Sequence, residues 1–521
     1  MTDSKNFYIT TPIYYVNGDP HLGHVYTTTA TDVVARFKRL AGYDVHFLTG
    51  TDEHGQKVAQ SAEKAGIAPQ EFCDNVAQKF RDVLEPFQIS NDDFIRTTED
   101  RHKRTCQTLW KTLEESGDIY LDKYAGWYAV RDEAYYGEDE LSDGADADTK
   151  IAIATGAECK WVEEESYFFR LSKYGDKLLE LYASNPDFIG PKSSYKEIKS
   201  FVEGGLKDLS ISRTTFDWGV PVPGNDKHVM YVWIDALTNY ISALGFGNDE
   251  PDLMDKFWPA DVHVVGKEIT RFHAIYWPAF LMSANLPVPN RVFANGWWVV
   301  EGEKMSKSIG NVITPETLLD TYGSDGSRFA LLREMPFGND GNFSHENAVN
   351  RINGDLANGL GNLAQRSLSM IAKNAEGKIP SNNGLSDDDS QLLSLAYDLP
   401  TRTEAYIDDI TIHKYLDAVW HVVGEANAYI DAQAPWKLKK EDPDRMQTVL
   451  YVLAEIIRCC AIMAQPIIPT GANKILDQVV IEQGARTFAH VSADYALTSG
   501  TEIPAPQGVF PRLELNKEEA A

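Results

Sequence analysis

The chain has 521 residues and a formal net charge of −28 at pH 7, from 49 lysines and arginines against 77 aspartates and glutamates. A chain of this length is expected to hold three or more domains, each able to bury a core. The acidic charge excludes a generally basic nucleic-acid-binding surface, because contacts to phosphates need lysine and arginine, so any RNA site must be local.

Several features bear on the cellular compartment. Residues 1–6 contain no apolar segment and no arginine-rich amphipathic pattern, so we expect neither a secretory signal nor a transit peptide. The five cysteines show no CxxC or disulfide-like spacing, which fits a reducing cytoplasm. Residues 449–468 are strongly apolar but are interrupted by Glu455, Arg458 and Pro466, so we expect a core helix and no membrane partner.

The first predicted unit joins a strand, residues 7–11, to a helix, residues 25–40, through a turn with two histidines. Such a turn gathers backbone N–H groups at the positive end of a helix dipole, where phosphate binds. His21 and His24 can donate hydrogen bonds to one phosphate chain, and Gly23 allows a nucleotide to approach the backbone. Two histidines at a helix start are also often structural, so this turn alone leaves both interpretations open.

A second buried-strand pattern at residues 44–49 follows that helix. Strand, helix and strand in succession predict a doubly wound parallel sheet, which binds ligands at the carboxyl ends of its strands. Asp52 follows this strand, where it suits a substrate amino group or, equally well, a helix cap. From about residue 117 to 221, short strands, aromatic residues and acidic turns indicate an inserted domain.

Three further strand patterns follow the insert, at residues 229–234, 263–266 and 292–300. The second ends at Gly266 and Lys267, which form either a ligand-facing turn or an ordinary strand end. The third leads into the lysine-containing loop 304–308, KMSKS, which on its own indicates only a solvated surface. From residue 350 onward, apolar positions at helical spacing predict an α-helical bundle.

The two histidines in His21-Leu22-Gly23-His24, combined with the KMSKS loop, resemble the paired signature of class I aminoacyl-tRNA synthetases. The similarity to the methionyl-tRNA synthetases extends over almost the whole chain. It implies an α/β fold: a Rossmann-type doubly wound parallel catalytic domain with an inserted connective domain, followed by an all-α anticodon-binding helix bundle. The implied divisions are 1–116 and 225–290 for the catalytic halves, 117–224 for the insert, 291–350 for the lysine-loop and stem-contact region, and 351–521 for the anticodon-binding domain.

The resemblance also implies roles for individual residues. The ATP-binding set is His21, Gly23, His24, Gly266, Lys267, Lys304 and Lys307, and its two histidines together with Lys304 and Lys307 are the catalytic set. The methionine-binding set is Ile13, Tyr15, Asp52, Trp233, Ala236, Tyr240, His273 and Trp277. The anticodon set is Asn362, Arg366 and Trp436. Aromatic rings hold a polarizable thioether well, although an aromatic cluster is more often plain core.

Related synthetases often carry a zinc knuckle of paired CxxC units in the connective insert. The corresponding stretches here contain a single thiol, Cys159, whereas tetrahedral structural zinc needs four nitrogen or sulfur ligands. The chain therefore resembles the metal-free branch of the family, and we expect no zinc or other bound metal. We expect Trp127, Tyr128 and Trp161 to fill the space as an aromatic mini-core.

The implied reaction has two steps and uses ATP with Mg²⁺. The methionine carboxylate attacks the α-phosphorus of ATP, which releases pyrophosphate and leaves methionyl adenylate. The terminal adenosine of methionine tRNA, initiator tRNA included, then attacks the activated carbonyl. A monomer is expected, because the chain shows no appended tRNA-binding, dimer-forming domain.

Three alternatives remain at this stage. One is a class I synthetase for another amino acid, and a second is a nucleotidyltransferase that needs no RNA. The third is a catalytically inactive, synthetase-like RNA-binding paralogue. The presence of both histidines and both loop lysines argues for activity, and the long region after the lysine loop argues against a nucleotidyltransferase.

Overall fold

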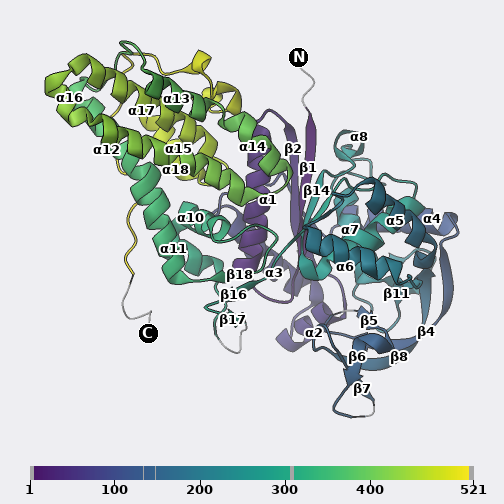
Figure 1. The fold of residues 1–521 in the computed structure, drawn as a ribbon. Coiled ribbons are helices and arrows are strands. Elements are labelled where there is room, and N and C mark those ends of the chain that lie inside the picture. The colour runs from purple at the N-terminus through teal and green to yellow at the C-terminus, as the bar shows by residue number, and fades with distance from the viewer. Residues whose placement is uncertain (1–4, 133, 147, 306–309, 516–521) are drawn as a thin grey trace.

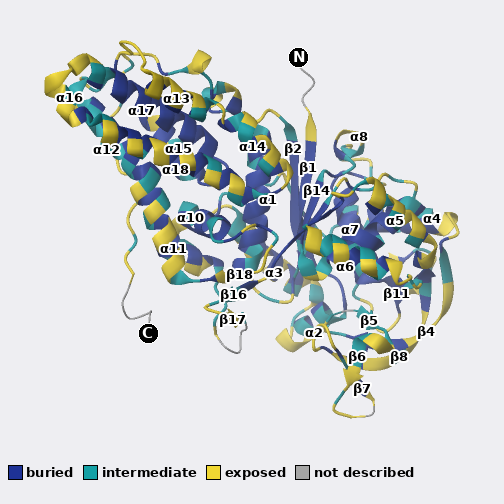
Figure 2. Ribbon diagram, in the orientation of Figure 1, coloured by how far each residue is buried: buried dark blue, intermediate teal, exposed yellow. Residues whose placement is uncertain are grey.

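The computed structural model describes residues 5–515 except 133, 147 and 306–309. The amino-terminal half of the chain is built around a parallel sheet, and the carboxyl-terminal part is a helical bundle beside it (Figure 1). Buried residues fill both parts and continue from one to the other through α1 (Leu22–Leu40), which lies between them (Figure 2).

Within the described residues, the central sheet has six parallel strands in the order β3-β2-β1-β14-β15-β9. Their bounds are β1 (Asn6–Tyr15), β2 (Asp44–Asp52), β3 (Asp93–Arg96), β9 (Ile189–Gly190), β14 (Val262–Gly266) and β15 (Val292–Asn295). The chain leaves β1 for β2 on one side, and β14 lies on the other, so the strand order reverses beside β1. Doubly wound sheets bind ligands at such a reversal. The predicted Rossmann-type sheet is confirmed.

Helices connect these strands. Their bounds are α2 (Gln56–Ala65), α3 (Pro69–Leu84), α4 (Asp100–Glu115), α5 (Gly175–Ser184), α6 (Lys192–Glu203), α7 (Val232–Ser242), α8 (Met254–Phe257), the π-helix η4 (Phe272–Tyr276) and α9 (Trp277–Ser283). Most of α1 is buried, because this helix contacts the sheet on one side and α10 (Pro315–Arg333) on the other. That sandwiched position explains why α1 is rich in alanine, valine and threonine and carries few charges.

The region predicted as an insert contains an antiparallel sheet in the order β5-β4-β8-β7-β6, with β10 paired to β8. The strands are β4 (Ile119–Ala129), β5 (Ala134–Tyr136), β6 (Leu141–Asp143), β7 (Thr149–Ala152), β8 (Glu158–Phe169) and β10 (Leu209–Ser210). The aromatic mini-core formed only in part. Trp127 contacts Trp161 edge-to-face at 5.4 Å, but Trp161 is 49% exposed and Tyr128 packs against Tyr135 instead. Cys159 lies in a small cluster of alanines.

Two of the strand predictions differ from the structure. Of the strand predicted at 229–234, only the first two residues belong to a strand, β13 (Asn225–Met230). The helix α7 begins at Val232. A short apolar run fits a buried strand or a buried helix, so its pattern could not separate them. β13 pairs with β11 (Ser212–Arg213) and β12 (Pro221–Val222) in a small antiparallel sheet apart from the central one.

The second difference is at 292–300, which the structure divides at Gly296 into β15 and β16 (Trp298–Val300). A Cβ at Gly296 would lie 2.1 Å from the carbonyl oxygen of Asn339, so the backbones cross closely there. β16 then joins a second small sheet with β17 (Glu303–Lys304) and β18 (Gly341–Phe343).

The predicted helical bundle is confirmed. Its elements after α10 are α11 (His345–Arg351), the π-helix η5 (Ile352–Gly361), α12 (Asn362–Asn374), α13 (Asp387–Tyr397), α14 (Leu399–Asp408), α15 (Ile412–Gln433), α16 (Pro435–Glu441), α17 (Pro443–Ala464) and α18 (Pro469–Gln478). In the described chain, α17 is the one helix long and apolar enough to cross a membrane, and 94% of its most apolar window is buried. It is the central helix of the bundle, packed against α15, α13, α12 and α18.

The bundle and the sheet share one core. Phe37 of α1 contacts Tyr415 and Phe488 at ring distances of 5.4 and 4.7 Å. The fully buried Arg328 of α10 donates to the carboxylate of Asp32 in α1 at 2.7 Å. Its guanidinium also donates to the carbonyls of residues 87, 466 and 467, so four of its five N–H groups make hydrogen bonds across the junction.

Candidate active site

The amino end of α1 lies at the carboxyl end of β1, and two histidines form its cap. His21 is the N-cap residue, and its Nδ1 accepts a hydrogen bond from the N–H of Gly23 at 3.1 Å. The backbone N–H of His21 in turn donates to Nδ1 of His24 at 3.1 Å. This is a reciprocal capping box built from imidazoles, and the two rings lie 4.0 Å apart.

The cap fixes the tautomers of the neutral rings. A nitrogen that accepts a hydrogen bond carries no proton, so both Nδ1 atoms are bare and both Nε2 atoms carry the N–H. Burial lowers the pKa of His24 well below its usual value, and the neighbouring His21 acts in the same direction. At neutral pH His24 is therefore a neutral donor. Tyr14 and Phe80 hold its ring edge-on, at 4.9 and 5.1 Å.

Gly23 has a local reason to be glycine. A Cβ at this position would lie 3.0 Å from Cε1 of His21 and 3.2 Å from its Nδ1. A side chain would therefore crowd the capping ring itself. The sequence argument gave Gly23 to close approach of a nucleotide, whereas the structure shows that the first neighbour it accommodates is His21.

A second part of the site is an aromatic wall formed by α7, η4 and the first residue of α9. Trp233 stacks on Phe272 with ring centres 3.7 Å apart and meets His273 edge-on at 6.2 Å. The hydroxyl of Tyr240 lies 2.7 Å from Nε2 of His273, and Trp277 lies 6.1 Å from the Tyr240 ring. The structure thus brings together the predicted aromatic residues, and it adds Phe272, which the sequence analysis missed although it directly precedes His273.

The polarity of this wall follows from its hydrogen bonds. Nδ1 of His273 lies 2.9 Å from the carbonyl oxygen of Ile269, so this nitrogen is the donor and Nε2 accepts from the Tyr240 hydroxyl. Burial lowers the pKa of His273 to about 4, against the opposing effect of the bond to Ile269. His273 is neutral at pH 7, so Tyr240 and His273 present a polar but uncharged edge. Ala236 is buried on α7, the helix that carries Tyr240.

The opposite side of the site comes from the ends of β1 and β2. Tyr15 and Asp52 are paired in register at the last positions of these two strands. Ile13 pairs with Gly50 two residues earlier. Asp52 is buried, whereas Ile13 and Tyr15 are half-buried and pack against the same core as Trp233. The strand ends therefore place the carboxylate of Asp52 next in register to Tyr15, which shares a hydrophobic core with Trp233.

Gly266 ends β14, the neighbour of β1, and Lys267 follows it at the start of a short 3-10 helix. A Cβ at Gly266 would lie 2.4 Å from a carboxylate oxygen of Glu268, so a side chain there would have to displace that carboxylate. The amine of Lys267 lies 2.6 Å from Asp340 and 3.8 Å above the ring of Trp297. Trp297 is fixed in turn by its Nε1–H, which donates to Glu268 at 2.7 Å. Trp297 and Asp340 were not predicted from the sequence, because their closeness to Lys267 is purely tertiary.

The lysine loop is only partly within the described residues. Lys304 ends β17, and its backbone pairs with Val299 of β16, but its side chain lies outside the described part of the structure. Lys307 lies wholly outside the described residues. The loop leaves a sheet whose strand β16 continues directly from β15, the strand next to β14.

The three predicted anticodon residues lie in the helical bundle, far along the chain from the turn with the two histidines. Asn362 and Arg366 are one turn apart on α12, and Trp436 lies on α16. The Arg366 guanidinium lies 5.8 Å from the centre of the Trp436 ring and 2.8 Å from the carboxylate of Asp431. Trp436 is 46% exposed. An exposed tryptophan beside an arginine forms a platform on which an unpaired base can stack.

Comparison with known proteins agrees with this arrangement. Residues 7–368 match the family described as tRNA synthetases class I (M), and residues 379–520 match the anticodon binding domain of methionyl tRNA ligase. The chain is 56% identical over 508 residues to a methionine–tRNA ligase of Mesorhizobium japonicum and 57% identical over 511 residues to one of Brucella suis. Each alignment covers 98% of this chain and 98% of the relative.

A solved structure gives the same result for the fold. The Mycobacterium tuberculosis methionyl-tRNA synthetase in complex with methionyl-adenylate superposes with a TM-score of 0.94 at 50% identity. The match covers 98% of this chain and all of that one. The similarity therefore includes the sheet, the insert and the helical bundle together.

Proposed function

Since the chain belongs to the class I methionyl-tRNA synthetases, we infer that it activates methionine with ATP and transfers the methionyl group to tRNA. The observation that carries the assignment of the site is its place in the sheet. The histidine cap of α1 and the pairing of Tyr15 with Asp52 both lie at the carboxyl end of β1, where the strand order reverses. The extent of the identity leaves no support for an inactive paralogue or for another amino acid.

His21 and His24 act as neutral hydrogen-bond donors to the phosphates of ATP. Both Nδ1 atoms serve the helix cap, so the contacts to phosphate come from the two Nε2–H groups. A preorganised pair of donors stabilises the charge that develops on the phosphate as the methionine carboxylate attacks. The backbone amides at the amino end of α1 add to this field. Magnesium bound with ATP would supply positive charge that neutralises the pyrophosphate.

The methionine substrate lies between Asp52 and the aromatic wall. The carboxylate of Asp52 pairs with the substrate ammonium group, and Ile13, Tyr15, Trp233, Ala236 and Trp277 surround the thioether. The polar edge made by Tyr240 and His273 is uncharged at pH 7, so it does not attract a charged side chain. A polarizable sulfur packs favourably against such rings.

Gly266 and Lys267 hold the nucleotide on the β14 side, and Lys304 and Lys307 neutralise the pyrophosphate from the loop beyond β17. Lys267 is paired with Asp340 in the structure, so ATP has to compete with that carboxylate. In the bundle, Trp436 stacks on an anticodon base, and Asn362 and Arg366 contact the edge of that base. The tRNA substrates include the initiator.

Other parts of the proposal concern the state of the protein. The insert binds no zinc, because its one thiol, Cys159, is buried among alanines and donates to the carbonyl of Ala157. Metal analysis of the purified protein should give well below one zinc per chain. The enzyme acts as a cytoplasmic monomer, which size-exclusion chromatography with light scattering would test.

The experiment that tests the function is charging of tRNA with labelled methionine, followed in the same preparation by pyrophosphate exchange. We expect both activities in the intact chain. We expect the Lys307→Ala variant to lower the activation rate far more than methionine affinity, because the loop acts on the leaving pyrophosphate. Equal losses in rate and affinity would contradict the role of the loop.

A further inference from the structure

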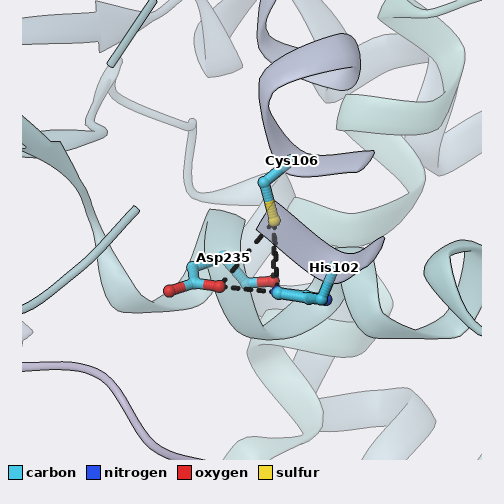
Figure 3. Close-up of side chains that lie close together, drawn as sticks. All are labelled: His102, Cys106 and Asp235. Carbon is cyan, nitrogen blue, oxygen red and sulfur yellow. Dashed lines mark hydrogen bonds and ion pairs between the residues drawn. The ribbon is translucent and has the colours of Figure 1, made fainter. Parts of the chain in front are cut away.

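A buried carboxylate behind the aromatic wall takes no part in the mechanism above. Asp235 lies on α7, and one of its carboxylate oxygens faces His102 and Cys106 of α4 (Figure 3). Oδ2 lies 2.7 Å from Nδ1 of His54, and Oδ1 lies 2.7 Å from Nε2 of His102 on α4. All three side chains are buried, and the thiol of Cys106 lies 3.2 Å from Nε2 of His102.

The group forms a hydrogen-bonded unit around one ionised carboxylate. Burial alone would raise the pKa of Asp235, but His54 and His102 together hold it well below its usual value. Both imidazoles therefore donate N–H to the carboxylate. Nδ1 of His102 also lies 3.0 Å from the hydroxyl of Ser242, the last residue of α7.

The same side chains offer a nitrogen, a sulfur and an oxygen, which is a ligand set for a transition metal. The distances favour hydrogen bonds. A zinc ion bound at about 2.0 to 2.1 Å by both Nε2 of His102 and Oδ1 of Asp235 would hold those atoms about 3.3 Å apart in tetrahedral geometry. The observed separation is 2.7 Å.

The segments that Asp235 connects are the two sides of the methionine site. Trp233 and Ala236 flank Asp235 on α7 and belong to the aromatic wall. His54 comes two residues after Asp52, the carboxylate at the end of β2. His54 is further held by Trp218, whose ring it meets edge-on at 5.5 Å and whose Nε1–H donates to the carbonyl of Glu53.

We propose that Asp235 is a positioning residue for methionine, which sets the distance between the carboxylate of Asp52 and the thioether-binding face of α7. This inference rests on the methionine site proposed above. Asp235 touches neither ATP-binding turn, because its partners come from α4 and from the end of β2. Loss of its charge therefore widens or tilts the methionine site while leaving the histidine cap of α1 in place.

The test is the kinetics of methionine-dependent pyrophosphate exchange in the Asp235→Asn variant. Asparagine keeps the shape but turns an amide N–H toward one of the imidazole donors. We expect the methionine KM to rise about tenfold or more, since a hydrogen bond to a charged group is lost, while the ATP KM stays within about twofold. Equal changes in both KM values, or an unchanged methionine KM, would overturn the proposal.

A second pair of variants covers the case in which Asp235→Asn does not fold. Glutamine can place an N–H near the position of Nε2 of an imidazole, so His102→Gln should keep the methionine KM within about threefold. His102→Leu removes the donor and should raise the methionine KM as Asp235→Asn does. The same rise in both His102 variants would show that volume, and not the hydrogen bond, matters and would overturn the proposal.

The control is another buried carboxylate network. Asp389 of the helical bundle accepts from Tyr429 at 2.6 Å and from Arg445, and it is as buried as Asp235. Asp389→Asn should lower the melting temperature without changing the methionine KM.

Stoichiometric zinc that disappears in Cys106→Ser would identify a metal site and overturn the inference. Failure of the wild-type chain to exchange with methionine would instead refute the proposed function.

Discussion

The backbone N–H of His21 donates to the imidazole of His24, while the imidazole of His21 accepts from the first turn of the same helix. In the proposed mechanism the two histidines therefore have two tasks each. Their Nδ1 atoms complete the cap of α1, and the proposed contacts to phosphate use their Nε2–H groups. Because the tasks use different ring atoms, substitutions can separate them.

The His21→Asn variant tests this separation. Asparagine is a good N-cap residue, so the side-chain acceptor for the N–H of Gly23 is kept, but the Nε2 donor is lost. We expect the melting temperature to stay within a few degrees of the wild type, while the rate of methionyl adenylate formation falls about a hundredfold. The measurement is single-turnover adenylate formation beside a thermal melt. A large loss of stability with unchanged chemistry would assign His21 to the cap alone.

Lys267 and Asp340 give a second prediction. ATP has to displace Asp340 if Lys267 binds its phosphates, and the Lys267 amine also lies 3.8 Å from the centre of the Trp297 ring. The Lys267→Met variant keeps an apolar stem and loses the charge, so the ATP KM should rise about tenfold while the methionine KM stays constant. Asp340→Asn removes the competing carboxylate and should leave the ATP KM equal or lower. A higher ATP KM in Asp340→Asn would mean that the ion pair itself shapes the site.

His273 gives a pH prediction. Its pKa is about 4 in the folded chain and about 6.5 when unfolded, so between these values the unfolded state binds more protons. Stability from the neutral, buried ring is full above about pH 6.5 and is lost as the pH falls toward 4, by up to about 3 kcal/mol. His273→Asn removes the titration. The difference in apparent stability between wild type and variant should therefore shrink from pH 7 to pH 4.5, as measured by thermal melts. A constant difference would contradict the lowered pKa.

Trp436 tests the anticodon platform. Stacking of one base on an aromatic ring contributes about 1 to 3 kcal/mol, so Trp436→Ala should lower kcat/KM for tRNA about tenfold to a hundredfold. Pyrophosphate exchange without tRNA should not change, because the residue lies on α16 of the bundle. Trp161→Ala is a matched control, since Trp161 is similarly exposed but lies on β8 of the insert. Equal effects of the two substitutions on charging would contradict a specific platform at Trp436.

Local sequence predicted the first turn well and the later strands less well. The strand and helix around His21 and His24 follow from periodicity and from the turn between them, and both are observed. The run 229–234 was wrong beyond Met230, because every residue there is apolar and all but the half-buried Trp233 are buried, whether in a strand or in α7. Periodicity carries no information where no face is exposed.

Prediction of the site from the sequence was limited in a similar way. Trp233, Ala236 and Tyr240, which share α7, were grouped through the family resemblance and not from their spacing. Contacts between distant segments could not be predicted. The stacking of Phe272 on Trp233 and the pairing of Asp235 with His54 join residues that are 39 and 181 positions apart in the chain. Only the tertiary structure brings these side chains together.

The central claim is that this site activates methionine, and pyrophosphate exchange tests it most directly. The measurement is the incorporation of labelled pyrophosphate into ATP, without tRNA, in the presence of each of the twenty amino acids in turn. We predict rapid exchange with methionine and only background exchange with the other nineteen. Exchange with a different amino acid would contradict the assignment of Trp233, Tyr240 and His273 to methionine, and absence of exchange with all twenty would contradict the activation step itself.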